Sequence, residues 1–222
     1  MNKLVGIVFL FGSLSATRAE DLSKYRNFQL GMNVSTVAGL AGTSASQVKT
    51  IHSRPELIQE LTWRPQPPGA SSQAEPAKQV VFSFYDGELY GIAVTYDRYE
   101  TEGMTAADFV EALSAKYGDA TVPVVPTKLA PRGYGEPDDV LAQWQDSQYR
   151  FSLTRSSFGS TYSLVGVLKR LEAPVQVAII ESKRLDDKEA PQREAARVSK
   201  YNDAERVRLE QARLLNKPKF RP

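Results

Sequence analysis

The stretch "KQVVFSFYDGELYGIAVTY", Lys78 to Tyr96, decides how the chain folds. Two runs rich in Val, Phe, Tyr and Ile flank Asp86-Gly87, a dipeptide typical of two-residue β-hairpin turns. Centred on that turn, the hairpin has a predicted register of Tyr85 with Glu88, Phe84 with Leu89, Ser83 with Tyr90, Phe82 with Gly91, and Val81 with Ile92.

This register gives the hairpin two different faces, because side chains alternate along a strand. One face is apolar and is expected to be buried beneath a helix: Val80, Phe82, Phe84, Leu89, Gly91 and Ala93. The other face is mixed, and on it Tyr85, Tyr90, Ile92 and Tyr96 form a candidate partner-binding surface, since tyrosine offers a large contact area with few rotatable bonds. The alternative is that the tail or the second half of the chain covers this face.

Two stretches outside the hairpin resemble each other. "RNFQLGMNVSTVAGLAG", Arg26 to Gly42, and "YETEGMTAADFVEALSAKYGDA", Tyr99 to Ala120, both contain Gly-Met, a capping residue, a short helical-period apolar run and a glycine. Asn33 and Thr105 are the expected N-caps. Each stretch therefore predicts a short amphipathic helix.

Similar β-rich segments follow each predicted helix. "LIQELTW", Leu57 to Trp63, and "VLAQWQD", Val140 to Asp146, each carry one tryptophan, and each precedes a hairpin, the second formed by Gln148–Arg155 and Thr161–Arg170. The order helix, strand, hairpin thus occurs twice. We expect an α+β fold built as a tandem repeat of one helix packed on a small antiparallel sheet. The alternative is two helices that share only a type of cap.

The N-terminus has the pattern of an export signal. Lys3 precedes the uncharged, mostly apolar run Leu4–Leu14, and "ATRA" at 16–19 predicts cleavage between Ala19 and Glu20. The run is shorter than the roughly 20 residues that a membrane span needs. We therefore expect a periplasmic or secreted protein. The absence of cysteine excludes disulfides and thiolate chemistry.

The predicted organisation is a signal peptide (1–19), a first unit (20–98), a second unit (99–171) and a charged helical or partly disordered tail (172–222). The tail is expected to be helical from Pro174, near its first turn, and interrupted at Pro191. The alternative for its start is an extra strand that includes Val175, Val177 and Ile179. From Lys183 to Pro222 there are 12 basic and 7 acidic residues, which gives a net charge of +5. From Glu20 to Ser182 there are 14 basic and 19 acidic residues, which gives a net charge of −5. The tail is predicted to contact the acidic body or an anionic partner; the alternative is a solvated, mixed-charge helix.

Catalytic motifs are scarce. His52 is the single histidine, no Gly-x-Ser-x-Gly motif occurs, and no segment has the spacing of a metal site or a phosphate-binding loop. Asp138-Asp139, in a proline-rich loop, and Asp186-Asp187 are expected to be solvated. No catalytic residue, cofactor or metal is predicted, and we expect a non-enzymatic protein whose partner is another envelope protein, with no nucleic acid. A carboxylate-dependent hydrolase and a small-ligand carrier are the alternatives.

From about Tyr25 to Arg170, the Gly-Met start, capped helix and Trp-containing β-meander resemble the small outer-membrane assembly lipoproteins of bacteria. The doubled unit resembles β-lactamase-inhibitor-protein architecture, and the mature chain is similar to a group of exported bacterial proteins. These resemblances imply a binding module. The chain lacks the lipid-modified cysteine of the lipoproteins and the disulfides of the inhibitors.

Overall fold

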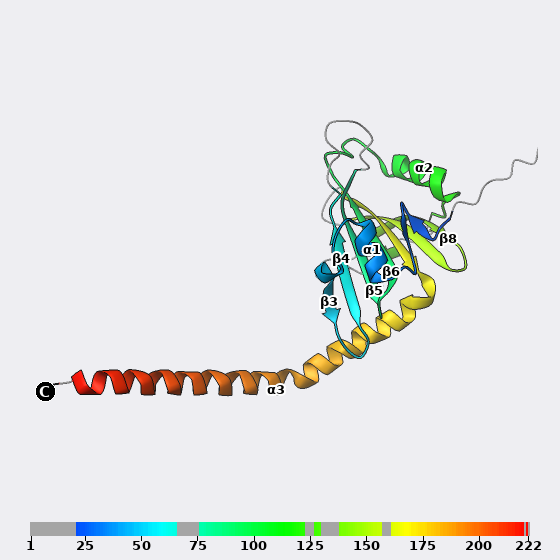
Figure 1. The fold of residues 1–222 in the computed structure, drawn as a ribbon. Helices are drawn as coiled ribbons and strands as arrows, with labels where there is room; N and C mark the ends of the chain where they lie inside the picture. Colours follow the sequence, from blue (N-terminus) through cyan, green and yellow to red (C-terminus); the bar gives the residue numbers. More distant parts are fainter. Residues whose placement is uncertain are drawn as a thin grey trace, which may run out of the picture.

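The computed structural model describes residues 21–65, 76–122, 127–129, 138–156, 161–219 and 221. The predicted signal peptide and its cleavage site, Ala19 and Glu20, lie outside the described residues. The fold is α+β, with one large antiparallel sheet, one two-stranded sheet and a long C-terminal helix (Figure 1).

Eight strands form the large sheet in the order β3-β4-β5-β6-β10-β9-β8-β7, and every neighbouring pair is antiparallel. The strands are β3 (Lys49–His52), β4 (Ile58–Trp63), β5 (Ala77–Tyr85), β6 (Glu88–Tyr96), β7 (Thr127–Leu129), β8 (Asp138–Gln145), β9 (Tyr149–Arg155) and β10 (Tyr162–Leu168). The predicted strand 161–170 thus ends at Leu168. Strands β3–β6 and β7–β10 join through β6 and β10 into one continuous sheet, where two small sheets were expected.

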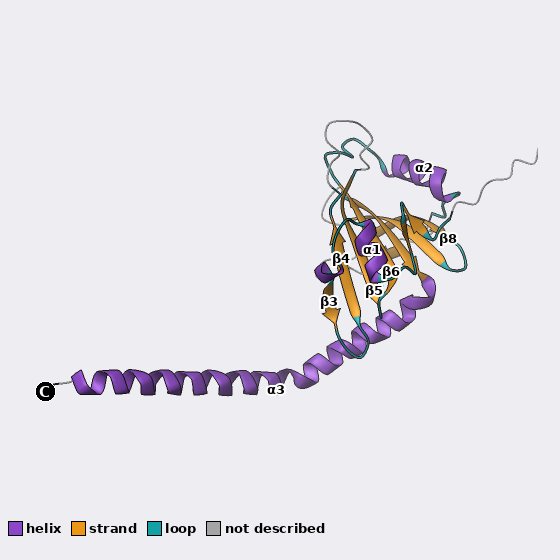
Figure 2. Cartoon of the chain, viewed as in Figure 1, coloured by secondary structure: helices purple, strands orange, loops and turns teal. Residues whose placement is uncertain are grey.

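One face of the sheet carries α1 (Val34–Leu40), α2 (Ala106–Tyr117) and the small sheet of β1 (Lys24–Tyr25) and β2 (Phe28–Gln29) (Figure 2). Phe28 of β2 packs on Phe82 of β5, with ring centroids 4.4 Å apart. At the other half of the sheet, Tyr117 of α2 stacks on Phe151 of β9 at 4.7 Å. These aromatic contacts bury a continuous core between the helices and the sheet.

The predicted helix caps are confirmed. Asn33 Oδ1 accepts a hydrogen bond from Thr36 N at 2.9 Å and begins α1. Thr105 and Asp108 form a reciprocal capping box at the start of α2, with Thr105 N donating to Asp108 Oδ2 at 2.6 Å. These short-range bonds satisfy backbone N–H groups that would otherwise lack partners at a helix start.

The hairpin register agrees with the prediction only next to the turn. Asp86 and Gly87 adopt positive φ, and Phe84 pairs with Leu89, but Ser83 then pairs with Gly91 and Phe82 with Ile92. The register shift leaves Tyr90 as an extra residue, which is a β-bulge. The predicted pairs of Ser83 with Tyr90, Phe82 with Gly91 and Val81 with Ile92 are therefore wrong.

The bulge changes which side chains face the core. Val80, Phe82, Phe84 and Leu89 are fully buried together, as predicted. Beyond Tyr90, however, Ile92, Val94 and Tyr96 join them in the core cluster. Gly91 and Ala93, which were expected in the core, pair with Val167 and Val165 and so lie on the opposite face.

Helix α3 (Lys169–Asn216) differs most from expectation. It begins directly after β10, ahead of Pro174, and continues through Pro191 as one 48-residue helix. The predicted start at Pro174 and interruption at Pro191 are therefore wrong, and the boundary between 171 and 172 falls in the first turn. In Figure 1, α3 changes direction between its first half beside the sheet and its second half, as expected when a proline removes a helix hydrogen bond.

Candidate partner-binding surface

The four residues predicted as a partner surface do not lie together in an exposed patch. Ile92 is 0% exposed and Tyr96 is 8% exposed, and the Tyr96 ring packs against Phe109 of α2 at 5.3 Å. Tyr85 and Tyr90 are half-buried and pack against the core cluster. The prediction of a shared face is wrong because the β-bulge turns Ile92 and Tyr96 inward.

The first half of α3 is anchored to the body by a buried stripe. Leu171, Val175, Ala178 and Ser182 are the buried residues of this helix, and their spacing of four, three and four residues places them on one side. Leu171 and Val175 belong to the same core cluster as the sheet residues. This half of α3 is therefore part of the folded body.

Polar contacts show the path of α3 across one end of the sheet. Near its start, Glu172 pairs with Arg150 of β9 and Arg170 pairs with Glu88 of β6. About three turns further on, at the edge of the sheet, Ser182 Oγ lies 2.7 Å from His52 Nδ1 of β3. Along the helix, the contacts are therefore with β6, then with β9 and last with β3.

Among the described residues, the last polar contact between α3 and the body lies two residues before Pro191. Arg54, in the loop after β3, donates to Glu189 with Nη1 at 2.6 Å from Oε1, and its Nη2 donates to the second carboxylate oxygen. This hydrogen-bonded pair holds the pKa of Glu189 below its ordinary value. The anchored half of α3 therefore ends at Glu189.

Beyond that point α3 projects from the body. The segment Pro191–Asn216 contains 26 residues and extends about 39 Å at helical rise. Every residue in it is exposed except Glu205 and Ala212, which are half-buried. Figure 1 shows this distal segment running away from the sheet to the C-terminus. We call Pro191–Asn216 the distal rod.

Ion pairs within the distal rod support its helical form. Each of its four acidic residues pairs with the arginine three positions later: Glu194–Arg197, Asp203–Arg206, Glu205–Arg208 and Glu210–Arg213. In three of these pairs the guanidinium makes two hydrogen bonds, which lowers the pKa of Glu194 and of Glu205. Each such pair stabilises a helix by about 0.2–0.5 kcal/mol, so the rod is reinforced without tertiary contacts.

Apolar side chains are exposed along one side of the rod. Val198, Tyr201, Leu209 and Ala212, with Glu205 between them, follow steps of three and four residues, and we call these four apolar residues the rod stripe. Tyr201 is 68% exposed and Leu209 is 53% exposed. Exposed apolar side chains that form a contiguous patch often mark a site of protein interaction.

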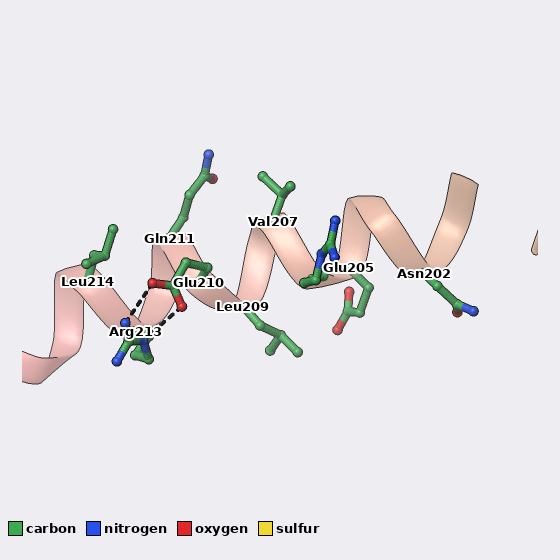
Figure 3. Close-up of a pocket in the computed structure, with 9 residues that line it drawn as sticks. Asn202, Glu205, Val207, Leu209, Glu210, Gln211, Arg213 and Leu214 are labelled. Carbon is green, nitrogen blue, oxygen red and sulfur yellow. Dashed lines mark hydrogen bonds and ion pairs between the residues drawn. The ribbon is translucent and has the colours of Figure 1, made fainter. Parts of the chain in front are cut away.

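One hollow of the described surface is bordered only by residues of this rod. Figure 3 shows them on a single helix, with Val207 and Leu209 pointing to opposite sides. No second element walls the space, so it is the open surface of a helix and not an enclosed site.

The other candidates from the sequence have structural environments of their own. His52 lies on β3 and contacts Ser182. Asp138 and Asp139 open β8, so their placement in a loop is wrong; burial, with Asp139 alongside, raises the pKa of Asp138. Asp186 Oδ1 accepts hydrogen bonds from Arg193 at 3.2 Å. Among the residues that the structure describes, no three His, Asp or Glu side chains group as metal ligands.

No family model matches the chain, and no curated protein or solved structure is similar to it. None of the helices in the described part of the chain is long and apolar enough to cross a membrane.

Proposed function

We propose that this chain is an exported, non-catalytic protein-binding module of the cell envelope, and that the distal rod is its recognition element. The observation that carries the proposal is the rod stripe, a row of apolar side chains, three of them exposed and Ala212 half-buried, on a helix that leaves the body after Glu189. Helices with anchors at steps of three and four residues bind in apolar grooves of partner proteins.

Tyr201 is the expected centre of this contact. Its side chain is the one aromatic group of the rod and is 68% exposed. Tyrosine is enriched among the residues that contribute most to binding at protein interfaces. Val198 and Leu209 flank it on the same side of the helix, and we expect them to enter the same groove.

The body serves as the platform that holds the rod. The element order of a helix followed by four antiparallel strands occurs at α1 and β3–β6 and again at α2 and β7–β10. We propose that these halves are a tandem duplication whose last strands, β6 and β10, meet at the centre of the sheet. Two helices cover one face of the sheet, and the first half of α3 crosses one end of it.

Export of the mature chain from residue 20 is part of the proposal. It rests on the sequence pattern of a signal peptide at positions 1–19, in which a lysine precedes an apolar run and small residues follow it. A binding role also fits the resemblance to envelope assembly lipoproteins and to inhibitor proteins.

Site-specific photo-crosslinking tests the proposal. A photoreactive group replaces Tyr201 in one variant of the mature protein and Ala196 in the control. Ala196 is also exposed but lies on the other side of the rod. In the native exported fraction, we expect one reproducible protein adduct from position 201 and none from position 196.

Adducts of equal yield from both positions would mean nonspecific contact and would contradict the proposal. The same conclusion would follow if no adduct formed at Tyr201 while a folded body and a helical rod were shown by circular dichroism.

A further inference from the structure

Positive charge is concentrated just beyond the last residue of α3, Asn216. After Glu210 the chain has no acidic residue, whereas Arg213, Lys217, Lys219 and Arg221 follow. Arg213 is already paired with Glu210. No ion pair forms between Lys217, Lys219 or Arg221 and any residue that the structure describes. We call these last three residues the basic tip.

Ion pairing along the rod explains why the surplus charge is at this end. Each acidic residue from Glu194 to Glu210 is paired with an arginine of the same helix. Lys200 is the one other basic residue of the rod for which no pair is found among the described residues. Positive and negative charges therefore nearly cancel in the middle of the rod, whereas the basic tip carries a positive net charge.

Exposed leucines lie directly beside the basic tip. Leu214 and Leu215 are 60% and 66% exposed, and they immediately precede Asn216 and the short turn Lys217–Lys219. Being consecutive, they leave the helix in different directions. A rigid protein groove receives one face of a helix, whereas a fluid lipid interface can take up side chains that point different ways.

We propose that the basic tip, with Leu214 and Leu215, binds the surface of an anionic phospholipid bilayer. The phosphate-bearing headgroups complement the charge of Lys217, Lys219 and Arg221, and the acyl boundary receives the two leucines. The proposed export of the chain disfavours nucleic acid as the anionic partner.

The length of the rod makes this contact compatible with an acidic body. Glu20 to Ser182 carries a net charge of −5 and would be repelled by an anionic surface at close range. The distal rod keeps the body about 39 Å from the tip, several times the screening length of about 8 Å at physiological salt. The contact uses other residues than the rod stripe, so it goes beyond the proposed function.

Vesicle co-sedimentation of the mature protein tests the proposal. The vesicles are phosphatidylcholine with phosphatidylglycerol, and pure phosphatidylcholine is the comparison. We expect binding to the anionic vesicles that weakens as salt increases, and little binding to the neutral ones. The tip variant combines Lys217→Gln, Lys219→Gln and Arg221→Gln; the control variant combines Lys49→Gln, Lys78→Gln and Lys183→Gln, three exposed lysines outside the rod.

Each basic residue near such a surface accounts for about fivefold in affinity, so the tip variant is expected to bind about a hundredfold more weakly. The control variant, which has the same net charge, is expected to bind like the unaltered protein. Leu214→Ser with Leu215→Ser is expected to weaken binding and leave its salt dependence in place.

Three results would overturn the proposal: equal loss in the tip and control variants, equal binding to neutral and anionic vesicles, or binding of an acidic protein by the tip with no binding to vesicles. A photo-crosslink at Tyr201 does not depend on any of these results, so the two proposals can fail separately.

Discussion

Ser182 Oγ lies 2.7 Å from His52 Nδ1, and this hydrogen bond joins α3 to the edge strand β3. Ser182 is buried although it is polar, and it ends the stripe of Leu171, Val175 and Ala178. The Ser182–His52 hydrogen bond and the Arg54–Glu189 ion pair together fix α3 at the edge of the sheet before the helix reaches Pro191. The direction of the distal rod is therefore set by contacts with β3 and the loop after it.

Replacement of Ser182 by alanine is expected to destabilise the protein by about 0.5–1.5 kcal/mol, the usual net value of a hydrogen bond. Urea unfolding of the mature protein measures the change. Ser199→Ala, at an exposed position of the rod, is the control and should leave stability unchanged. Equal stability of both variants would mean that the bond to His52 does not anchor α3.

The β-bulge at Tyr90 predicts a large difference between two isoleucines. Ile92 is fully buried, whereas Ile180 on α3 is 67% exposed. Ile92→Ala is expected to cost about 2–5 kcal/mol because it leaves a cavity. Ile180→Ala should change stability by less than about 0.5 kcal/mol. Similar small effects at both positions would indicate the unbulged register, in which Ile92 faces away from the core.

Gly166 of β10 lies against the ring of its cross-strand partner Phe151. A Cβ atom at this position would be 2.3 Å from Phe151 Cε1, whereas one at Gly39 in α1 would meet nothing within 4 Å. Gly166→Ala is therefore expected to destabilise by about 1–3 kcal/mol through overpacking, and Gly39→Ala to stabilise by about 0.5–1 kcal/mol. Thermal unfolding measures both; a neutral Gly166→Ala would contradict the tight Phe151 contact.

A carboxyl pair near the sheet end predicts a pH dependence. A hydrogen bond with Asp86 and the charge of that carboxylate raise the pKa of Glu56 above its ordinary value of 4.5. The folded protein thus binds this proton more tightly than the unfolded chain, so stability decreases as pH rises from about 4.5 through the raised pKa. Glu56→Gln removes the penalty and should increase the melting temperature near neutral pH.

The benefit of Glu56→Gln should fade as the pH falls below about 4.5, where Glu56 is protonated in both states. If Glu56→Gln increased the melting temperature equally at acid and neutral pH, the raised pKa of Glu56 would be excluded as the cause.

Several features of the fold follow from short-range chemistry and were predictable. Asp86-Gly87 has the positive φ values that its turn requires, and Asn33 and Thr105 cap the helices that they precede. Phe82, Phe84 and Leu89 are buried because side chains point alternately to the two faces of the hairpin on either side of the turn. In each case the deciding contacts lie within a few residues along the chain.

Features that depend on distant contacts were not predictable. The bulge at Tyr90 brings Ile92 and Val94 opposite Gly166 and Leu164 of β10, some 70 residues later in the sequence. The low helix propensity of proline predicted a break at Pro191. In the structure α3 runs through this residue. Ser182 and Glu189 anchor the helix before Pro191, and arginine–carboxylate pairs stabilise it after Pro191. The predicted tyrosine surface failed for the first reason, and the continuity of α3 through Pro191 was missed for the second.

The central claim is that a self-contained body presents the distal rod to a protein partner. Affinity capture with crosslinking from the native exported fraction, using the mature chain and a chain ending at Ala190, tests it most directly. The shorter chain keeps the anchoring stripe and the Arg54–Glu189 pair, so it should unfold cooperatively with nearly unchanged stability. We expect a partner that the mature chain captures and the folded shorter chain does not; capture of the same partner by both would place recognition on the body and contradict the account.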